Sequence, residues 1–431
     1  MQQETTKRLF KGQLATGCAA LALSFAVAAV IWPAWSLTVK SLYTAVAAPG
    51  LAAADPKSAG NLVGAVARGT FFWMVINTWI WFTIVLGNYG KTALTTKQPW
   101  AGIYYTLIAW SVGVAAFLAL ISFLGIWWHP FSLAIMFTPQ SPEEVHLAFE
   151  AWEASNFYAL AVIIAQIPMV SLLQKWPFAG KAEKPVDGFG ALAMGTALTW
   201  IVWMALIVPS FMKLAIGEHQ IVTAPFGSWP AFAAFCQAYV IFAIMPVEGA
   251  ELYPMRLFAK KQPFMGLIGF GIALAAGFAM PAAIKAVVAP LDLLPGAPLD
   301  VVAASLELSV IVFMLAWHHL FDDYPNATLI PNTAARVCSR VAIWFGGGTV
   351  YGLIWIKSFK LIPYGANDLG LGVPPLGVLA GQFALLMTLL FLNTFFDKWP
   401  LVRKVKEPAT SAATEASASA GASPGFEAMA K

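Results

Sequence analysis

The stretch "WHHLFDDYPN" (317–326) ends an apolar segment with two histidines, two aspartates and an aromatic–proline pair. Three further segments close in a similar way, with "QKWP" at 174–177, "ELYP" at 251–254 and "DKWP" at 397–400. A degenerate fifth copy, "GNYG", lies at 87–90, and the prolines of the full copies are 77, 71 and 75 residues apart. Each interval accommodates two membrane helices with their turns. We call these stretches the closing motifs, and their spacing predicts tandem two-helix hairpins.

The composition places these hairpins in a lipid bilayer. Apolar residues make up 59% of the chain and charged residues only 11%, which is far outside the range of soluble domains. Crossing the hydrocarbon core takes about 20 residues. We therefore predict an all-α integral membrane domain over residues 1–406, with ten transmembrane helices arranged as five tandem two-helix hairpin repeats. The predicted helices lie near 16–39, 68–88, 101–128, 155–174, 190–214, 230–252, 264–289, 301–322, 340–362 and 374–396.

The basic residues predict the orientation of these helices. With the N-terminus inside, the inner segments hold 18 of the 25 Lys and Arg residues, and basic residues are retained on the cytoplasmic side. Both termini are therefore expected in the cytoplasm, and the membrane is expected to be a bacterial-type inner membrane. The segment 407–431 is rich in Ala, Ser and Thr, which predicts a disordered cytoplasmic tail.

Two other structural expectations follow from the sequence. An inverted five-plus-five repeat, as in many transporters, is the alternative arrangement of ten helices, with Pro33 and Pro246 marking broken helices. The acidic connection 137–156 has Val145, Phe149 and Trp152 at helical spacing, which predicts a short amphipathic helix on the outer surface.

The acidic residues of the closing motifs need compensation. A helix C-terminus carries partial negative charge and disfavours a carboxylate, yet Glu251, Asp322 and Asp397 all occupy the position two residues before the aromatic residue. We expect a cation, an arginine from the next loop or a proton to offset each charge.

Two layers of polar residues on the even-numbered predicted helices are candidates for function, since polar groups inside a membrane are costly. The outer layer, 16 or 17 residues before the motif aromatics, consists of Gln237, Glu307 and Gln382. Glu307 is its only acid and is either a buried packing group or a carboxylate that accepts a proton or a cation. The inner layer lies at the closing motifs and consists of Glu248, Glu251, His318, His319, Asp322, Asp323, Asn393 and Asp397.

Helical spacing groups the inner layer into pairs. His318 with Asp322, and His319 with Asp323, are four residues apart and are expected to share a helix face. Each pair could couple a proton or chelate a metal such as Fe, Mn, Zn or Cu, with Glu248, Glu251 and Asp397 able to supply further ligands. Interfacial capping is the alternative role.

These features predict a secondary transporter or channel for a small solute, coupled to protons or cations, and this function needs no cofactor. The alternative is a membrane metal-dependent enzyme or redox subunit that acts on a hydrophobic substrate or quinone at the cytoplasmic face, and a membrane scaffold is a third possibility. The chain has no phosphate-binding loop and no soluble domain, which excludes ATP-driven transport by this chain alone. Lipid and a small-molecule solute are the expected partners, a homo-oligomer or membrane complex is open, and no nucleic acid is expected.

Overall fold

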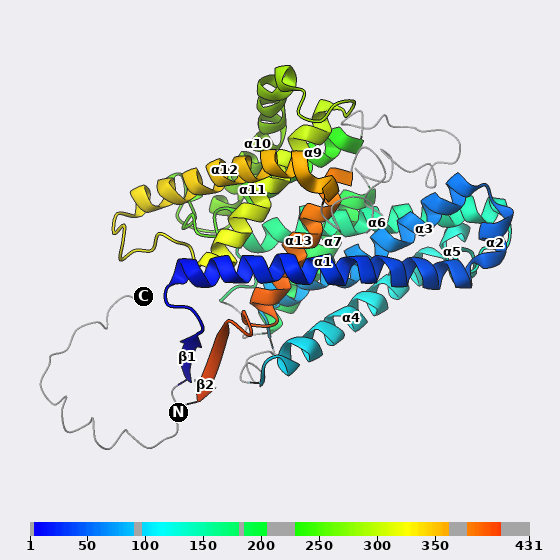
Figure 1. Ribbon diagram of the computed structural model, residues 1–431, viewed down its shortest axis with the longest axis horizontal. Coiled ribbons are helices and arrows are strands. Elements are labelled where there is room, and N and C mark those ends of the chain that lie inside the picture. The colour runs from blue at the N-terminus through cyan, green and yellow to red at the C-terminus, as the bar shows by residue number, and fades with distance from the viewer. Residues whose placement is uncertain (1–3, 90–96, 181–184, 205–228, 362–376, 407–431) are drawn as a thin grey trace, which may run out of the picture.

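The structure is a computed structural model that describes residues 4–89, 97–180, 185–204, 229–361 and 377–406. Helices account for most of the described chain, which is consistent with an all-α membrane protein (Figure 1). The longer elements are α1 (Gln13–Val46), α3 (Pro56–Phe71) continued by the π-helical turns η1 (Phe72–Asn77) and η2 (Ile80–Val85), α4 (Trp100–Leu124), α6 (Pro142–Ser171), α7 (Val186–Val202), α9 (Trp229–Ile244), α10 (Phe264–Val288), α11 (Leu299–Phe321), α12 (Thr333–Ser358) and α13 (Gly377–Thr394).

Short elements join these helices or extend them. They are β1 (Glu4–Arg8), α2 (Ala48–Ala53), η4 (His129–Phe131), α5 (Leu133–Phe137), η6 (Met255–Leu257), η7 (Ala289–Leu291), η8 (Phe359–Leu361) and β2 (Val402–Lys406).

Seven of the described helices are long and apolar enough to cross a membrane. They correspond to α1, α3 with η1 and η2, α4, α6, α10, α11 and α12. Three shorter apolar helices, α7, α9 and α13, overlap the remaining predicted segments. Parts of two of those segments, 205–214 and 374–376, and the predicted tail 407–431 lie outside the described residues.

Five of the helices form the centre of the molecule. α3, α6, α9, α11 and α13 contact one another in that order. Trp79, between η1 and η2, closes the circle by donating a hydrogen bond to Thr394 of α13 at 3.1 Å. These five are the inner helices, with η1 and η2 counted as part of α3. Most of the apolar window of α6 and of α11 is buried, 83% in each, so the core of the protein lies here.

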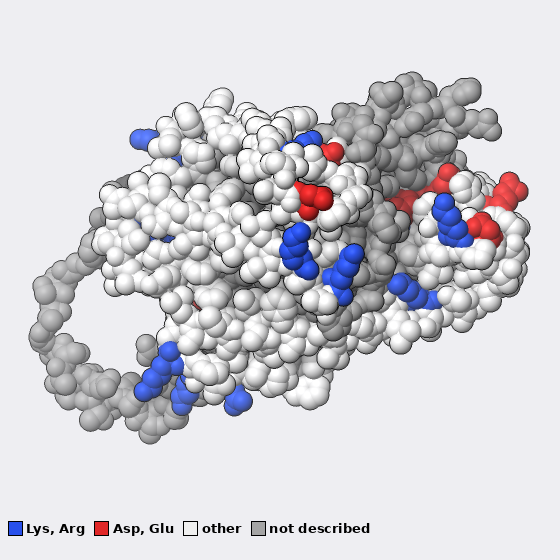
Figure 2. Space-filling view, turned by 45° about the horizontal axis from the view of Figure 1, so that its top comes forward, with Lys and Arg blue, Asp and Glu red and all other residues white. Residues whose placement is uncertain are grey.

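The remaining long helices, α1, α4, α7, α10 and α12, surround this centre and are the outer helices. Only 22–33% of the apolar window of α1, α4, α10 and α12 is buried, and large apolar side chains such as Leu37, Ile108, Phe278 and Ile354 are exposed on them. Most of the face shown in Figure 2 carries no Lys, Arg, Asp or Glu. A surface of this kind suits contact with lipid.

Small residues let the outer helices approach the inner helices closely. On α10 the buried residues include Gly269, Ala273 and Gly277, four residues apart. On α12 a Cβ at Gly348 would lie 2.7 Å from the Cα of Val310 on α11. Small residues at this spacing favour helix packing in membranes, where close van der Waals contact replaces the hydrophobic effect.

The closing motifs share one backbone geometry. The first two residues of each full copy have left-handed φ values, for example 49° and 56° at Asp322 and Asp323 and 51° and 59° at Asp397 and Lys398. The degenerate copy has the same pair at Gly87 and Asn88, with φ of 61° and 57°. A left-handed residue ends an α-helix, and the motif begins within three residues of the last helical residue of η2, α6, α11 and α13, whereas α9 ends at Ile244, seven residues before its motif. The aromatic–proline bond of each full copy is cis.

The starts of the outer helices dock on these motifs. Gln13 of α1 donates to the carbonyl of Asp322 at 2.9 Å, and Gln98, just before α4, donates to the carboxylate of Asp397 at 2.8 Å. Gln262, before α10, donates to the carbonyl of Leu172 at 2.8 Å, beside the motif that follows α6. In α12, Arg336 contacts the motif that follows α9, and Gly188 of α7 lies against the end of η2.

This docking follows a constant rule along the chain. The α10 and α12 helices each contact the motif that lies two motifs earlier in the sequence or the residues beside it, α7 lies against Val85 and Leu86 just before such a motif, and α1 and α4 contact the last two motifs. The ring of outer helices is therefore closed. α1 and α4, the first outer helices of the chain, contact the last two motifs, which no later outer helix can contact.

The two ends of the described chain lie together. β1 pairs antiparallel with β2, with Lys7 opposite Arg403, and Figure 1 shows the two strands side by side. Both ends therefore lie on one side of the helix assembly.

The expectation of an amphipathic surface helix within 137–156 was wrong. Ser141 caps the N-terminus of α6 by accepting from the backbone N–H of Glu144, and the helix continues without a break to Ser171. Val145 and Trp152 are buried in the core, so their helical spacing marks the start of an inner helix.

Candidate functional site

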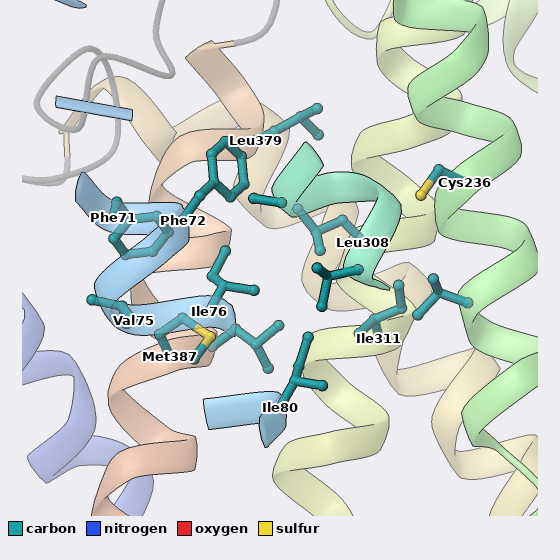
Figure 3. Close-up of a cluster of buried hydrophobic side chains, with 14 of the residues drawn as sticks. Phe71, Phe72, Val75, Ile76, Ile80, Cys236, Leu308, Ile311, Leu379 and Met387 are labelled. Carbon is teal, nitrogen blue, oxygen red and sulfur yellow. The ribbon is translucent and has the colours of Figure 1, made fainter. Parts of the chain in front are cut away.

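An apolar cavity of about 80 Å³ lies between the inner helices. Figure 3 shows Ile76 and Ile80 directed toward Leu308 and Ile311 of α11, with Met387 of α13 beside them. The wall is almost entirely aliphatic and aromatic, and Gln237 and Glu248 are its strongly polar members. All five inner helices, or the turns that end them, contribute to the wall: Ile76, Trp79, Ile80, Ile84, Leu160, Ile163, Ile167, Cys236, Gln237, Val240, Ile244, Glu248, Leu308, Ile311, Leu315, Phe383, Leu386, Met387 and Leu390.

A larger polar cavity of about 430 Å³ lies at the closing motifs. We call it the vestibule, because it lies beside β1 and β2, at the end of the assembly where the described chain begins and ends. Its wall consists of Arg8, Thr16, Asn88, His319, Asp322, Asn393, Thr394, Asp397, Lys398 and Val402.

The cluster of Glu248, His318 and His319 lies between the two cavities. Glu248 lines the apolar cavity and His319 lines the vestibule. One side-chain nitrogen or oxygen from each of the three residues lies within 4.8 Å of the others. The Nε2 atom of His318 is 3.0 Å from a carboxylate oxygen of Glu248, and its Nδ1 atom is 2.9 Å from Asp323. The arrangement joins imidazole and carboxylate groups at the boundary between apolar and polar space.

The pairing expected from helical spacing is corrected by this geometry. α11 ends at Phe321, and the left-handed backbone of Asp322 and Asp323 turns the chain out of the helical register. Asp323 therefore reaches back to His318, while His319 contacts the amide of Asn393 at 2.8 Å. The expected pairs His318 with Asp322 and His319 with Asp323 do not form.

Two further residues of the expected metal set have other partners. Glu251 accepts from the Nε atom of Arg336 at 2.8 Å. Asp322 accepts from Lys398 at 2.5 Å and contacts Arg8 at 3.3 Å. These ion pairs occupy the carboxylates, so Glu251 and Asp322 are not placed to join His318 and His319.

Burial raises the pKa of the Glu248 carboxyl, which follows the end of α9. The positive charge of His318 lowers this pKa, and the nearby Asp323 carboxylate raises it.

The outer layer is only partly brought together. Gln382 of α13 donates to the hydroxyl of Ser305 at 3.0 Å and accepts from Ser309 at 2.9 Å, both on α11. Glu307 is 0% exposed, and neither carboxyl oxygen has a hydrogen-bond partner among the described residues. Gln237 lines the apolar cavity, whereas Gln382 and Glu307 are outside its described wall.

Several polar residues at these sites were missed by the sequence analysis. Lys398 and Gln98 line or support the vestibule, and Asn77 is fully buried in η1 with neither amide atom hydrogen-bonded to a described residue. The repeated "KQP" at 97–99 and 261–263 is a signal that could have identified the docking glutamines Gln98 and Gln262. A lone asparagine in an apolar run could have identified Asn77.

Comparison of the chain with known protein families, with characterised proteins and with solved structures finds no match. Its function is therefore argued from its own residues.

Proposed function

We propose that the protein is a membrane transporter or channel that moves a small solute along the axis of the inner helices. The observation that carries this proposal is the alignment of three features. An apolar cavity walled by all five inner helices, a cluster of ionisable groups and a polar vestibule follow one another toward the end of the assembly where β1 and β2 lie.

The proposed arrangement has ten transmembrane helices in five tandem hairpins. The recurring left-handed pair in five motif copies and the constant docking rule of the outer helices support this reading over the inverted five-plus-five repeat. The distribution of basic residues supports a cytoplasmic location for both termini in a bacterial-type inner membrane.

The cavity wall suggests how passage is controlled. A narrow apolar stretch excludes water and ions when it is dry, which is one way that channels close. Transport of protons or cations also requires groups that bind and release them along the path. We propose that Glu248, His318, Asn393 and Asp397 are these groups at the vestibule end of the path. Gln237, Gln382 and Glu307 are proposed for the opposite side.

Substitution of one wall residue by a polar one tests this proposal. Ile311→Ser places a hydroxyl in the apolar cavity, where it favours hydration of the path. Liposomes that contain the variant should pass protons or K⁺ several-fold faster than liposomes that contain the parent protein, as measured with an entrapped pH-sensitive dye and a K⁺ electrode. Ile354→Ser is the matched control, because Ile354 is 62% exposed on α12 and faces outward.

The control separates a specific path from general leakage. Equal fluxes for the parent, Ile311→Ser and Ile354→Ser proteins, all at the level of empty liposomes, would contradict conduction along this axis.

A second candidate function is a membrane metal-dependent enzyme or redox subunit. The position of Glu248 in the wall of the apolar cavity, beside two histidines, favours it. The cavity of about 80 Å³ would then hold a small apolar substrate or part of a larger one. This reading predicts no increase in flux for Ile311→Ser.

A further inference from the structure

We propose that Glu248, His318 and His319 bind one first-row transition-metal dication, with Asp323 and Asn393 orienting the two imidazoles. This site goes beyond the proposed movement of a solute, and of the acids that the sequence suggested as ligands it retains only Glu248. The site joins the turn after α9 to α11, and Asn393 of α13 supports it.

The spacing of the three residues suits a shared ion. Ligand atoms at about 2.0–2.2 Å from a metal lie roughly 3–3.5 Å from one another. The Nε2 of His318 and the Glu248 oxygen are already 3.0 Å apart, and the full set lies within 4.8 Å. Small side-chain rotations are sufficient to bring the third ligand, His319, to the same distance.

The outer ring nitrogens have the partners that metal-bound histidines use. A histidine ligand commonly donates its second N–H to a carboxylate or an amide oxygen, which fixes the ring and leaves the other nitrogen for the metal. The Nδ1 of His318 is 2.9 Å from Asp323, and the Nδ1 of His319 is 2.8 Å from the Asn393 amide. Because amide oxygen and nitrogen exchange places by a rotation, Asn393 can accept from His319.

Hydrogen bonding without a metal accounts for only part of the cluster. A protonated His318 would satisfy both Glu248 and Asp323, with one ring N–H directed at each. It would leave the Nε2 of His319 without a partner, since this buried atom has no hydrogen bond to any described residue. A metal ion supplies that partner and also balances the charge of the two carboxylates.

The ligand types define the class of metal. Two imidazoles with one carboxylate suit Fe²⁺, Mn²⁺, Co²⁺ or Zn²⁺, whereas Mg²⁺ and Ca²⁺ prefer sets composed of oxygen ligands. Three protein ligands also leave coordination positions open. Glu248 lines the apolar cavity, so an open position on that side could receive water or a small ligand.

Titration with Co²⁺ tests the site directly. The full chain is purified in detergent without a polyhistidine tag, stripped of metal with a chelator and titrated with Co²⁺ while the visible absorption bands of the bound ion are recorded. We expect about one Co²⁺ per chain, competed by Zn²⁺. Glu248→Gln and His319→Gln should each weaken binding by at least 100-fold, and Asp323→Asn should weaken it by about 10- to 100-fold.

Two matched variants control for Co²⁺ binding elsewhere on the chain. His146 lies 3.4 Å from Glu150 on the exposed start of α6, so His146→Gln controls for binding at an ordinary surface His–Glu pair. Glu251→Gln controls for a nearby carboxylate outside the site. Both should bind Co²⁺ like the parent chain.

Folding of each variant is checked by gel filtration and circular dichroism before titration. Folded Glu248→Gln and His319→Gln proteins that keep the parent affinity would overturn the proposal, as would a parent chain that binds no Co²⁺. Neither result depends on flux, so failure of the metal site and failure of the transport proposal are distinguishable.

Discussion

At the scale of single residues, the acid in each closing motif has its own partner. Glu251 pairs with Arg336, Asp322 with Lys398 and Arg8, and Asp397 with Gln98. The expected compensation is confirmed at Glu251 and Asp322, where cations pair with the acid, whereas the partner of Asp397 is the neutral amide of Gln98, which was not among the expected groups. Compensation also holds helices together, because Arg336 and Gln98 belong to or directly precede outer helices.

The Glu251–Arg336 pair should contribute strongly to stability. The Arg336 side chain is only 8% exposed, so Glu251→Ala leaves a buried charge without its acid, and removal of one partner of a buried pair costs roughly 3–5 kcal/mol. We expect a large fall in the unfolding temperature in detergent. Arg8→Ala is the control, because both side chains of its pair with Asp322 are exposed, 41% and 42%, and the loss should be about 1 kcal/mol or less. Equal losses would contradict this account.

Glu307 is the residue of the outer layer for which a packing role and a proton-accepting role predict different results. Glu307→Gln keeps the shape and hydrogen-bonding capacity of the side chain and removes its titrating proton. In liposomes, the variant should fold and express like the parent but lose solute flux or the pH dependence of flux. Unchanged flux and pH dependence in Glu307→Gln, together with unchanged flux in His318→Ala, would identify both residues as packing groups.

At the scale of helices, the packing of the outer helices depends on glycines that differ in their surroundings. Within "GGG" (346–348), a Cβ at Gly346 would meet nothing within 4 Å, whereas one at Gly348 would meet the backbone of Val310. The backbone of an inner helix cannot move aside as a flexible side chain can, so the identity of Gly348 is set by contact.

This difference gives a test within three residues. Gly348→Ala should destabilise the protein by about 1–3 kcal/mol because it forces α12 away from α11. Gly346→Ala should be neutral or stabilising by up to about 1 kcal/mol, since alanine is the better helix former. Thermal unfolding of both variants in one detergent measures the contrast. A larger loss for Gly346→Ala would show that α12 does not pack on α11 through this face.

At the scale of the whole molecule, the antiparallel strands β1 and β2 bring the two ends of the chain to one side. Together with the basic residues, this predicts the membrane orientation. A reporter fused after Lys406 should be active in the cytoplasm, and one inserted near Gly296, between α10 and α11, should be external. The reverse result for either position would contradict the proposed topology.

The sequence by itself determined the membrane class and the approximate place of the helices, although α3 and α6 begin at Pro56 and Pro142, 12 and 13 residues before the predicted segments. Apolar runs with a length set by the bilayer specify helices locally, and each predicted segment overlaps an observed helix. The closing motif could also be identified from the sequence, because its left-handed residues and its proline affect only the adjacent backbone. The choice of Gln237, Glu307 and Gln382 followed from the cost of polar groups in lipid, but only the structure separated the cavity wall from helix contacts.

Only the tertiary structure decided which groups meet at the centre. His318 and Asp322 are four residues apart, but helical spacing fails once the backbone turns left-handed, so Asp323 takes the expected place of Asp322. Glu248 lies 70 residues before His318 in the sequence, and their contact depends on how α9 packs against α11. Local patterns cannot determine such pairings, because the closure of the helix ring and the docking of every outer helix set them together.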